Sequence, residues 1–278
     1  MITIGLTGWS DHSLLGTNKK TTLEDYSRHF PFVEMDTSFY AIPPEKNIQS
    51  WMNKTPDSFQ FIPKAFQAMT QHKKWNDDFA SEKAMFTAFL NRFSPMIEAG
   101  RIKSFLFQFP PYFGCTKAHF HYLENIRRWM GDNPIAIEFR NASWFTSENT
   151  DHTLSFLREK KFIHTIVDQP QTPNNSIPLI AESTNQQLSI LRLHGRNFKG
   201  WQGENKLNWR AERTLYDYSK NELQDFAALA KSLESKSHEV AVIFNNNSGG
   251  HAAKNAKELQ AILQLSFSGL SPRQLDLF

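Results

Sequence analysis

The sequence predicts an α/β fold of one specific kind, a single (β/α)8 TIM barrel that spans residues 1–268. Eight short apolar runs are separated mostly by segments with helical spacing, and polar residues gather where the runs end. The length of 278 residues, 40% of them hydrophobic, suits one barrel-sized domain. An open doubly wound sheet is the competing fold, but such sheets usually need fewer strands.

The eight expected strands are rich in β-branched and aromatic residues, as is typical of strands buried on both faces. They cover residues 2–7, 32–36, 59–64, 104–109, 135–139, 162–168, 188–194 and 239–245. Pro63 falls inside the third of them, where a missing backbone N–H is awkward for a central strand.

Helices are expected between most of these strands, on the evidence of apolar periodicity and of acidic residues near helix starts. Their ranges are 23–30, 45–54, 81–93, 117–130, 151–160, 221–234 and 251–265. Two stretches are expected to be long loops instead: 169–185, rich in Pro and Asn, and 196–218, rich in Lys, Arg, Asn and Trp.

Composition narrows the class of protein. The lone Cys115 excludes an internal disulfide and a cysteine-cluster metal site. The N-terminal sequence lacks the features of a signal peptide, and no apolar run approaches the ~20 residues that span a bilayer. We therefore expect a cytoplasmic protein without a membrane segment. A net charge of +3 permits a nucleic-acid or phosphate partner without requiring one.

Charged residues follow the expected strands in a repeated pattern. Glu138 and Arg140 stand two residues apart, so they project from one face of their strand. Buried strands carry such charges when the charges pair or serve chemistry. The residues expected at one barrel mouth are Glu34, Asp36, Lys64, Gln108, Glu138, Arg140, Asp168, Arg192, His194 and Asn245. An ion-pair network that plugs the barrel is the alternative reading.

These residue types predict several roles at the mouth. Glu138 or Asp168 would act as a general base and His194 as an acid. Oxygen and imidazole ligands for Mg, Mn or Zn would come from Glu34, Glu138, Asp168 and His194. Phosphate or substrate contacts are expected from Lys64, Gln108, Arg140, Arg192, Asn245 and Asn246, the last two opening a Gly-rich loop. Trp9, Tyr40 and Trp144 would stack on bases or sugars, or else anchor their loops on the core.

Several motifs resemble those of one known family. They are GLTGW at 5–9, VEMDTSFY at 33–40, FLFQFPP at 105–111, IEFRNASW at 137–144, RLHGRN at 192–197 and FNNNSGGHAAKNA at 244–256. Together with VDQP at 167–170 they resemble the YecE-like family, domain of unknown function 72, over residues 2 to 265. The resemblance implies a TIM barrel and no established activity.

The C-terminal residues 269–278 are expected to form a flexible tail, because a Gly/Ser/Pro break precedes them. Their last five residues, Gln-Leu-Asp-Leu-Phe, resemble the peptide by which bacterial replication and repair proteins bind the DNA sliding clamp. Leu275, Leu277 and Phe278 would enter an apolar pocket, and Gln274 would add an orienting hydrogen bond. The alternative is a tail that covers apolar surface on its own barrel.

Three hypotheses of function follow. The first is a DNA-associated hydrolase, a metal-dependent phosphodiesterase or nuclease-like enzyme that the tail recruits to the clamp. The second is an enzyme that acts on a sugar or phosphorylated metabolite by carboxylate and histidine acid–base catalysis. The third is a ligand-binding barrel without catalysis.

Overall fold

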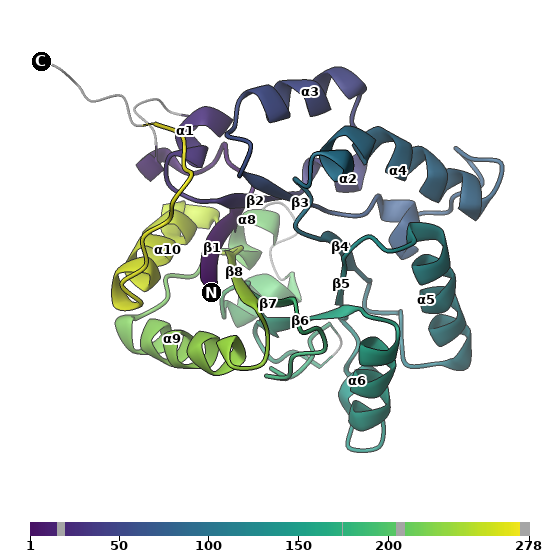
Figure 1. Cartoon of the computed structure of the whole chain (residues 1–278). Helices are drawn as coiled ribbons and strands as arrows, with labels where there is room; N and C mark the ends of the chain where they lie inside the picture. The colour runs from purple at the N-terminus through teal and green to yellow at the C-terminus, as the bar shows by residue number, and fades with distance from the viewer. Residues whose placement is uncertain (16–19, 174, 204–208, 273–278) are drawn as a thin grey trace, which may run out of the picture.

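Eight parallel strands form a nearly closed barrel in the computed structural model, which describes residues 1–15, 20–173, 175–203 and 209–272. The strands are β1 (Ile2–Thr7), β2 (Phe32–Met35), β3 (Gln60–Pro63), β4 (Phe105–Gln108), β5 (Ile135–Glu138), β6 (Ile163–Asp168), β7 (Leu188–Leu193) and β8 (Glu239–Phe244). Helices surround this barrel (Figure 1). The predicted fold class and the position of every predicted strand are confirmed.

The barrel is weakest between β3 and β4, where two isolated bridges replace a continuous ladder. The backbone of Phe61 bonds to Arg101 and Lys103, just before β4, and the N–H of Ala65, just after β3, donates to Leu106 of β4. Pro63 lies between Phe61 and Ala65 in the sequence, so its backbone nitrogen also faces β4. Proline has no N–H, so it donates no hydrogen bond there. The proline therefore explains why the ladder opens at this seam.

The helices packed around the barrel are α1 (Leu23–Ser27), α3 (Glu45–Asn53), α4 (Glu82–Glu98), α5 (Lys117–Met130), α6 (Thr150–Glu159), α9 (Lys220–Glu234) and α10 (His251–Ile262). Hydroxyl side chains begin four of these seven helices. Thr22, Ser81, Thr116 and Ser219 each accept a hydrogen bond from a backbone N–H of the first turn. All seven coincide with predicted helices to within a few residues.

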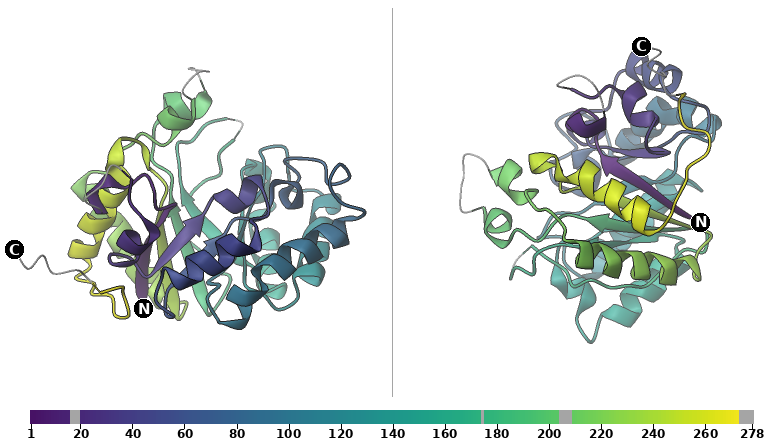
Figure 2. Two further views of the ribbon diagram at one scale, coloured as in Figure 1. Left: turned by 90° about the horizontal axis from the view of Figure 1, so that it is seen from above. Right: turned by 90° about the vertical axis from the view of Figure 1, so that its left-hand side faces the viewer.

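Short helices occupy two connections, one of which was expected to be a long loop. Residues 196–218 contain α7 (Phe198–Gln202) and α8 (Trp209–Arg213), which rise from the C-terminal end of the barrel (Figure 2). A further turn, α2 (Thr37–Tyr40), follows β2. The prediction of a loop at 196–218 was therefore wrong in part, because Asn197 caps a helix with its own side chain.

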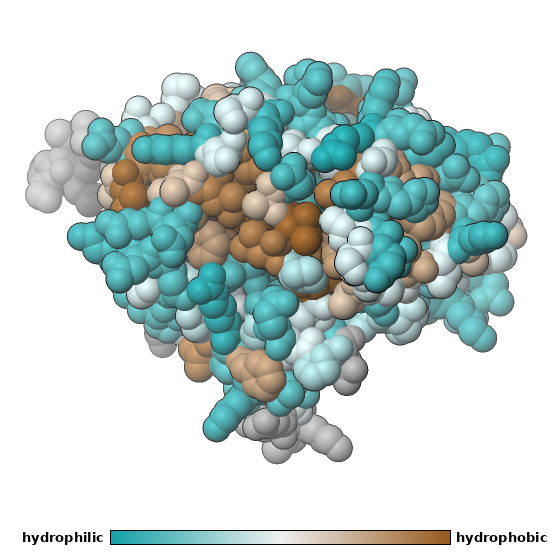
Figure 3. Space-filling view, turned by 90° about the horizontal axis from the view of Figure 1, so that it is seen from below, coloured by the Kyte–Doolittle hydropathy of each residue, from teal (hydrophilic) through white to brown (hydrophobic). Residues whose placement is uncertain are grey.

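The connection from β6 to β7 has no helix in its described residues, 169–173 and 175–187. Figure 3 views the molecule from the side that carries α6, α9 and this connection, and apolar side chains show in the middle of that face. Leu179 of the connection is 37% exposed. The loop predicted at 169–185 is confirmed for the described residues.

Two apolar layers hold the fold together. The inner layer fills the barrel with residues from seven strands, among them Phe32, Ile62 and Ile190. The larger outer layer packs the sheet against the helices. Gly5 permits the close approach of β1 to β2, since a Cβ there would lie 2.6 Å from the Phe32 ring. The apolar interior ends where the strands reach the charged mouth.

The segment that follows α10 stays on the barrel further than expected. Ser58 donates to the Gly269 carbonyl at 2.8 Å, and the backbone N–H of Ser271 donates to Ser27 O at 3.1 Å. The prediction that the free tail begins at residue 269 is therefore wrong for Gly269 and Ser271. The clamp-like residues Gln274, Leu275, Leu277 and Phe278 lie outside the described residues. In the described part of the chain, no helix combines the length and apolarity that a membrane span needs.

Candidate functional site

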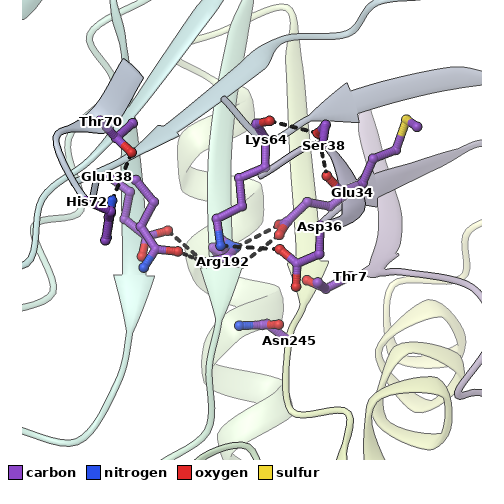
Figure 4. Close-up of polar contacts among 12 residues, drawn as sticks. Thr7, Glu34, Asp36, Ser38, Lys64, Thr70, His72, Glu138, Arg192 and Asn245 are labelled. Carbon is purple, nitrogen blue, oxygen red and sulfur yellow. Dashed lines mark hydrogen bonds and ion pairs between the residues drawn. The ribbon is translucent and has the colours of Figure 1, made fainter. Parts of the chain in front are cut away.

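Arg192 of β7 is the centre of a buried charge network at the C-terminal end of the barrel (Figure 4). Its Nε and Nη2 donate to the two Glu34 carboxylate oxygens at 2.7 and 2.5 Å. Its Nη1 donates to Glu138 Oε2 at 2.9 Å and to Gln108 Oε1 at 3.3 Å. One guanidinium thus ties together β2, β4, β5 and β7.

Arg140 supplies a second guanidinium beside the first. Its Nη2 lies 2.6 Å from Glu138 Oε1, and its Nη1 donates to Gln169 Oε1 at 2.9 Å. Glu138 is therefore held between two arginines, and its side chain has no exposed surface. Burying such charges is tolerable because each carboxylate oxygen accepts a charged hydrogen bond.

His194 completes the network from the end of β7. His194 Nε2 lies 3.1 Å from Glu138 Oε1 and 3.2 Å from a guanidinium nitrogen of each arginine. The other ring nitrogen, Nδ1, lies 2.8 Å from Asn245 Nδ2. Gly195 then turns the chain with a φ of 84°, where a Cβ would lie 2.6 Å from Tyr216 Cβ. The turn fixes the imidazole against the carboxylate.

Electrostatics set the protonation states of this network. Burial would raise the pKa of Glu138, but the charges of Arg192 and Arg140 hold that pKa well below its usual range. Burial, helped by the same two arginines, lowers the pKa of His194 well below its usual range. Burial would lower the pKa of Arg192, but Glu34 and Glu138 raise it above its ordinary value. Glu138 is therefore ionised and His194 neutral at neutral pH.

A cavity of about 530 Å³ opens directly above the network. Arg140 and Arg192 lie at its floor, since they are only 3% and 1% exposed. Its lining residues come from loops and strand ends around the mouth: Asp11, Asp36, Tyr40, Lys64, Gln108, Arg140, Arg192, Trp209, Ala211, Arg213, Thr214, Asn245, Asn247 and Ser248. This volume is within the range of small-molecule sites, about 300–1,000 Å³.

Asp36 and Lys64 form an ion pair that is accessible from the cavity. Lys64 Nζ lies 3.2 Å from Asp36 Oδ1, and the two side chains are 13% and 43% exposed. Burial would raise the pKa of Asp36, but Lys64 and then Arg192 lower it. The Ser38 hydroxyl bridges the ends of β2 and β3, 2.7 Å from the Lys64 carbonyl and 3.0 Å from that of Met35.

His72 is a residue of this region that the sequence analysis did not select. Thr70 Oγ1 lies 2.9 Å from His72 Nδ1, as Figure 4 shows. Desolvation, together with the charges of Lys64 and Arg140, lowers the pKa of His72 to about 4. The imidazole is therefore neutral at neutral pH and adds a polar, uncharged group near the mouth.

The α7–α8 segment brings a third arginine to the cavity. Trp201 of α7 lies between two guanidiniums: Arg140 Cζ is 4.8 Å and Arg213 Cζ 3.9 Å from its ring centroid. Burial and the charge of Arg140 lower the pKa of Arg213 to about 9. In the described residues no carboxylate forms an ion pair with Arg213. No sequence pattern marks this residue, because its position depends on how α8 folds back over the mouth.

Polar atoms at the floor are left without partners. Within the described residues, the buried Thr7 Oγ1, Arg140 Nε and Asn247 Oδ1 accept or donate no hydrogen bond. All three follow or end strands at the mouth, and Arg140 and Asn247 line the cavity. Buried polar atoms are normally satisfied, so these are candidates for contacts with water or a ligand.

Most of the predicted mouth residues do converge: Glu34, Lys64, Gln108, Glu138, Arg140, Arg192, His194 and Asn245 join the network or the cavity wall, and Tyr40 lines the cavity. Asp168 does not. It is in register with Leu193 of the outer layer, whereas Val167 pairs with Arg192. Its carboxylate points outward and accepts from Tyr218 and Arg196 at 2.7 and 2.9 Å.

Three other assignments are corrected by burial. Trp144 is fully buried and stacks on Phe139 at 4.1 Å, with its indole N–H donating to Phe113 O. Trp9 packs edge-on against Trp51 and does not line the cavity. Asn246 is buried and donates to Tyr216 O and Asn255 Oδ1. All three anchor loops on the core.

The predicted metal ligands do not form one site. Asp168 points away from the barrel, and Glu34 and Glu138 are bound on either side of Arg192. A guanidinium between two carboxylates occupies the place that a cation would take. Among the described residues, no group of three or more His, Cys, Asp or Glu side chains is arranged to hold a metal ion. The metal set Glu34, Glu138, Asp168 and His194 is therefore not supported.

Fold and site together define a TIM-barrel protein with an arginine-rich pocket at the C-terminal mouth. The chain belongs to the family described as "Protein of unknown function DUF72", whose model matches residues 3–276. This confirms the resemblance to the YecE-like family.

Related proteins match all or part of the chain. It is 44% identical to the UPF0759 protein YunF of Bacillus subtilis over 282 residues, all of both chains. It is 34% identical to the UPF0759 protein YecE of Escherichia coli over 160 residues, 56% of this chain and 54% of that protein. A crystal structure of a DUF72 family protein from Enterococcus faecalis matches with a TM-score of 0.94 and 43% identity, covering 99% of this chain and 100% of the other.

A second solved DUF72 protein, from Thermotoga maritima, is more distant. It matches with a TM-score of 0.80 and 28% identity, covering 95% of this chain and 100% of that one. None of these names states an activity, so function has to be argued from the site.

Proposed function

We propose that this protein is an enzyme that binds a small phosphorylated metabolite in the mouth cavity and moves a proton on it by acid–base catalysis. The observation that carries the proposal is the accessible Asp36–Lys64 pair, 3.2 Å apart, at a cavity whose floor is made of guanidinium groups. Of the predicted hypotheses, this is closest to the second.

The distribution of charge supports an anionic ligand. Lys64, Arg140, Arg192 and Arg213 line the cavity, whereas the carboxylates that balance two of them, Glu34 and Glu138, lie beneath with no exposure. Of the described residues that line the cavity, four are cationic and two, Asp11 and Asp36, are carboxylates, so the lining carries an excess of positive charge. Guanidinium groups suit phosphate because they present several N–H donors in one plane.

The chemistry is assigned to the accessible groups and not to the buried ones. Asp36 is ionised and can accept a proton, and the Lys64 ammonium stabilises negative charge as it develops on the substrate. Glu138 and His194, predicted as base and acid, are almost completely buried and bound to the arginines. Glu138 is therefore a positioning residue that holds Arg140 and Arg192 toward the cavity.

Binding is tested with Arg213→Ala against a panel of sugar phosphates, by calorimetry. We expect about 10- to 100-fold weaker binding, because a charged hydrogen bond contributes about 1.5–3 kcal/mol. Arg158→Ala is the matched control, since Arg158 lies on α6 and pairs with Glu182 at 4.0 Å. Equal affinities for both variants would contradict the assignment of the cavity.

Catalysis is tested by exchange of substrate protons in D2O, followed by NMR. Asp36→Asn should slow exchange by about 10²- to 10⁴-fold, the usual effect of a general base, with affinity changed only a few-fold. Asp78→Asn is the control, because Asp78 forms an exposed pair with Lys73 at 2.6 Å. Exchange that survives in Asp36→Asn would contradict the role of Asp36.

A second candidate role rests on the sequence of the tail. We propose that Gln274, Leu275, Leu277 and Phe278 bind the bacterial sliding clamp in the cytoplasm and so bring the barrel to DNA. The full chain and a chain ending at residue 273 would be compared for clamp binding by surface plasmon resonance. Equal binding by the two chains would remove the reason to place this protein at DNA.

A further inference from the structure

Two aromatic side chains line the mouth cavity and are exposed to solvent. Tyr40 is 54% exposed and Trp209 is 41% exposed, although large aromatic rings usually lie buried. Other exposed aromatics, Phe198 at 46% and Tyr112 at 64%, are not lining residues of this cavity. The mouth therefore presents aromatic surface at a place where a ligand would pass.

The two rings come from different sides of the mouth. Tyr40 ends α2, directly after β2, and Trp209 begins α8 in the connection after β7. In the sheet, β1 and β8 lie between these two strands. The rings are thus presented by two independent segments.

Depth in the cavity separates the aromatic groups from the cations. Arg140 and Arg192 are nearly buried at the floor, whereas Tyr40 and Trp209 are at the exposed rim. A ligand that contacts both the arginine floor and the aromatic rim carries an anionic group at one end and a flat apolar ring at the other. Phosphate is the anion that arginines bind in a bidentate manner, and a nucleobase is the flat ring that aromatic side chains stack on.

We infer that the ligand of this cavity is a nucleotide, with its phosphate at Arg213 and the floor arginines and its base against Tyr40 and Trp209. The unpaired Asn247 Oδ1 and the exposed Asp11 carboxylate are acceptors for base amino groups or ribose hydroxyls. This inference rests on the proposed function, because it specifies the substrate class of the same cavity.

The test compares three ligands on the full-length protein by calorimetry: inorganic phosphate, ribose 5-phosphate and nucleoside 5′-monophosphates. We expect nucleotides to bind about tenfold or more tightly than ribose 5-phosphate, because stacking of one base contributes about 1–3 kcal/mol. Tyr40→Ala and Trp209→Ala should each weaken nucleotide binding about 5-fold to 100-fold. Both variants should bind ribose 5-phosphate as the parent does.

Phe198→Ala is the matched control, an exposed aromatic residue outside the cavity lining. Nucleotide and ribose 5-phosphate affinities that are equal, or a loss in Phe198→Ala as large as in Trp209→Ala, would overturn the nucleotide inference alone. If none of the three ligands binds the parent, the proposed function fails as well.

A free nucleotide and the phosphorylated end of a nucleic-acid strand share this chemistry. A short single-stranded oligonucleotide with a 5′-phosphate is therefore included beside the mononucleotides. Tighter binding of the oligonucleotide, again weakened in Trp209→Ala, supports the inference and identifies a strand end as the source. Tighter binding of the mononucleotide supports it and identifies a free metabolite.

Discussion

The two ends of the barrel both bury charge, but they do so differently. At the N-terminal end, Lys103 pairs with Glu239 at 2.7 Å, and Thr3 Oγ1 donates to the same carboxylate at 2.5 Å. A cavity of about 440 Å³ lies there too, yet none of its described lining residues carries an unpartnered buried polar side-chain atom. At the C-terminal end, arginines gather and Thr7, Arg140 and Asn247 keep unpaired atoms.

The difference separates a structural plug from a binding site. At the lower end Lys103 and Glu239 pair with each other, Thr3 donates to the same carboxylate, and no described lining residue carries an unpartnered buried polar side-chain atom. The upper end places its carboxylates below its guanidiniums and leaves polar atoms unsatisfied. Such an arrangement costs stability in the free protein, which is common at functional sites.

The largest expected effect comes from removing one carboxylate at each end. Glu138→Gln leaves Arg140 and Arg192 with one buried partner too few, and we expect it to lower the free energy of unfolding by about 3–5 kcal/mol. Glu239→Gln should lower it by roughly half as much or less, because a buried lysine can release its proton and an arginine cannot. Urea unfolding measures both, and an equal loss in the two variants would contradict the comparison.

The response to pH should also differ between the two ends. The pKa of His194 is lowered by burial, so the unfolded chain takes up its proton first as the pH falls below about 6.5. Unfolding free energy should therefore fall with acidification, and less steeply in His194→Gln. At the lower end, burial lowers the pKa of Lys103 from 10.5, so the unfolded chain keeps that proton longer and stability should rise as the pH approaches 10.5.

Midpoints of urea unfolding, measured across the pH range, would show both the loss of stability at acid pH and the gain at alkaline pH. Lys103→Met should reduce the gain at alkaline pH and leave the loss at acid pH unchanged. If His194→Gln follows the parent at every pH, the imidazole is not the group that makes the mouth sensitive to acid.

The smallest expected effect compares two threonines of β1. Thr7→Val removes an unpartnered hydroxyl at the mouth, so stability should stay within about 1 kcal/mol of the parent or rise slightly. Thr3→Val removes a bond to Glu239 and should cost about 1.5–3 kcal/mol. Anion affinity should weaken about 2- to 10-fold in Thr7→Val only. A greater loss of stability in Thr7→Val than in Thr3→Val would contradict the assignment of the lower end as structural and the mouth as a binding site.

Much of the upper end could be predicted because strand parity is a local property. Glu34, Glu138, Arg140, Arg192 and His194 follow the two-residue period of their own strands, and the structure brings them together. Parity also placed Asp168 at the mouth, and that prediction was wrong, because Val167 and not Asp168 is in register with Arg192. The period within one strand does not say which of its two faces points into the barrel.

The barrel could be predicted from the sequence, because apolar runs, turn residues and helix caps act over a few residues and repeat eight times. Which polar residues face a ligand depended instead on how the loops pack. Trp144 and Asn246 were drawn into the core, while Arg213 and Trp209 were brought over the mouth by the folding of α7 and α8. Loops have no repeating backbone geometry, so the direction of a loop side chain is set by its tertiary contacts and not by its position in the sequence.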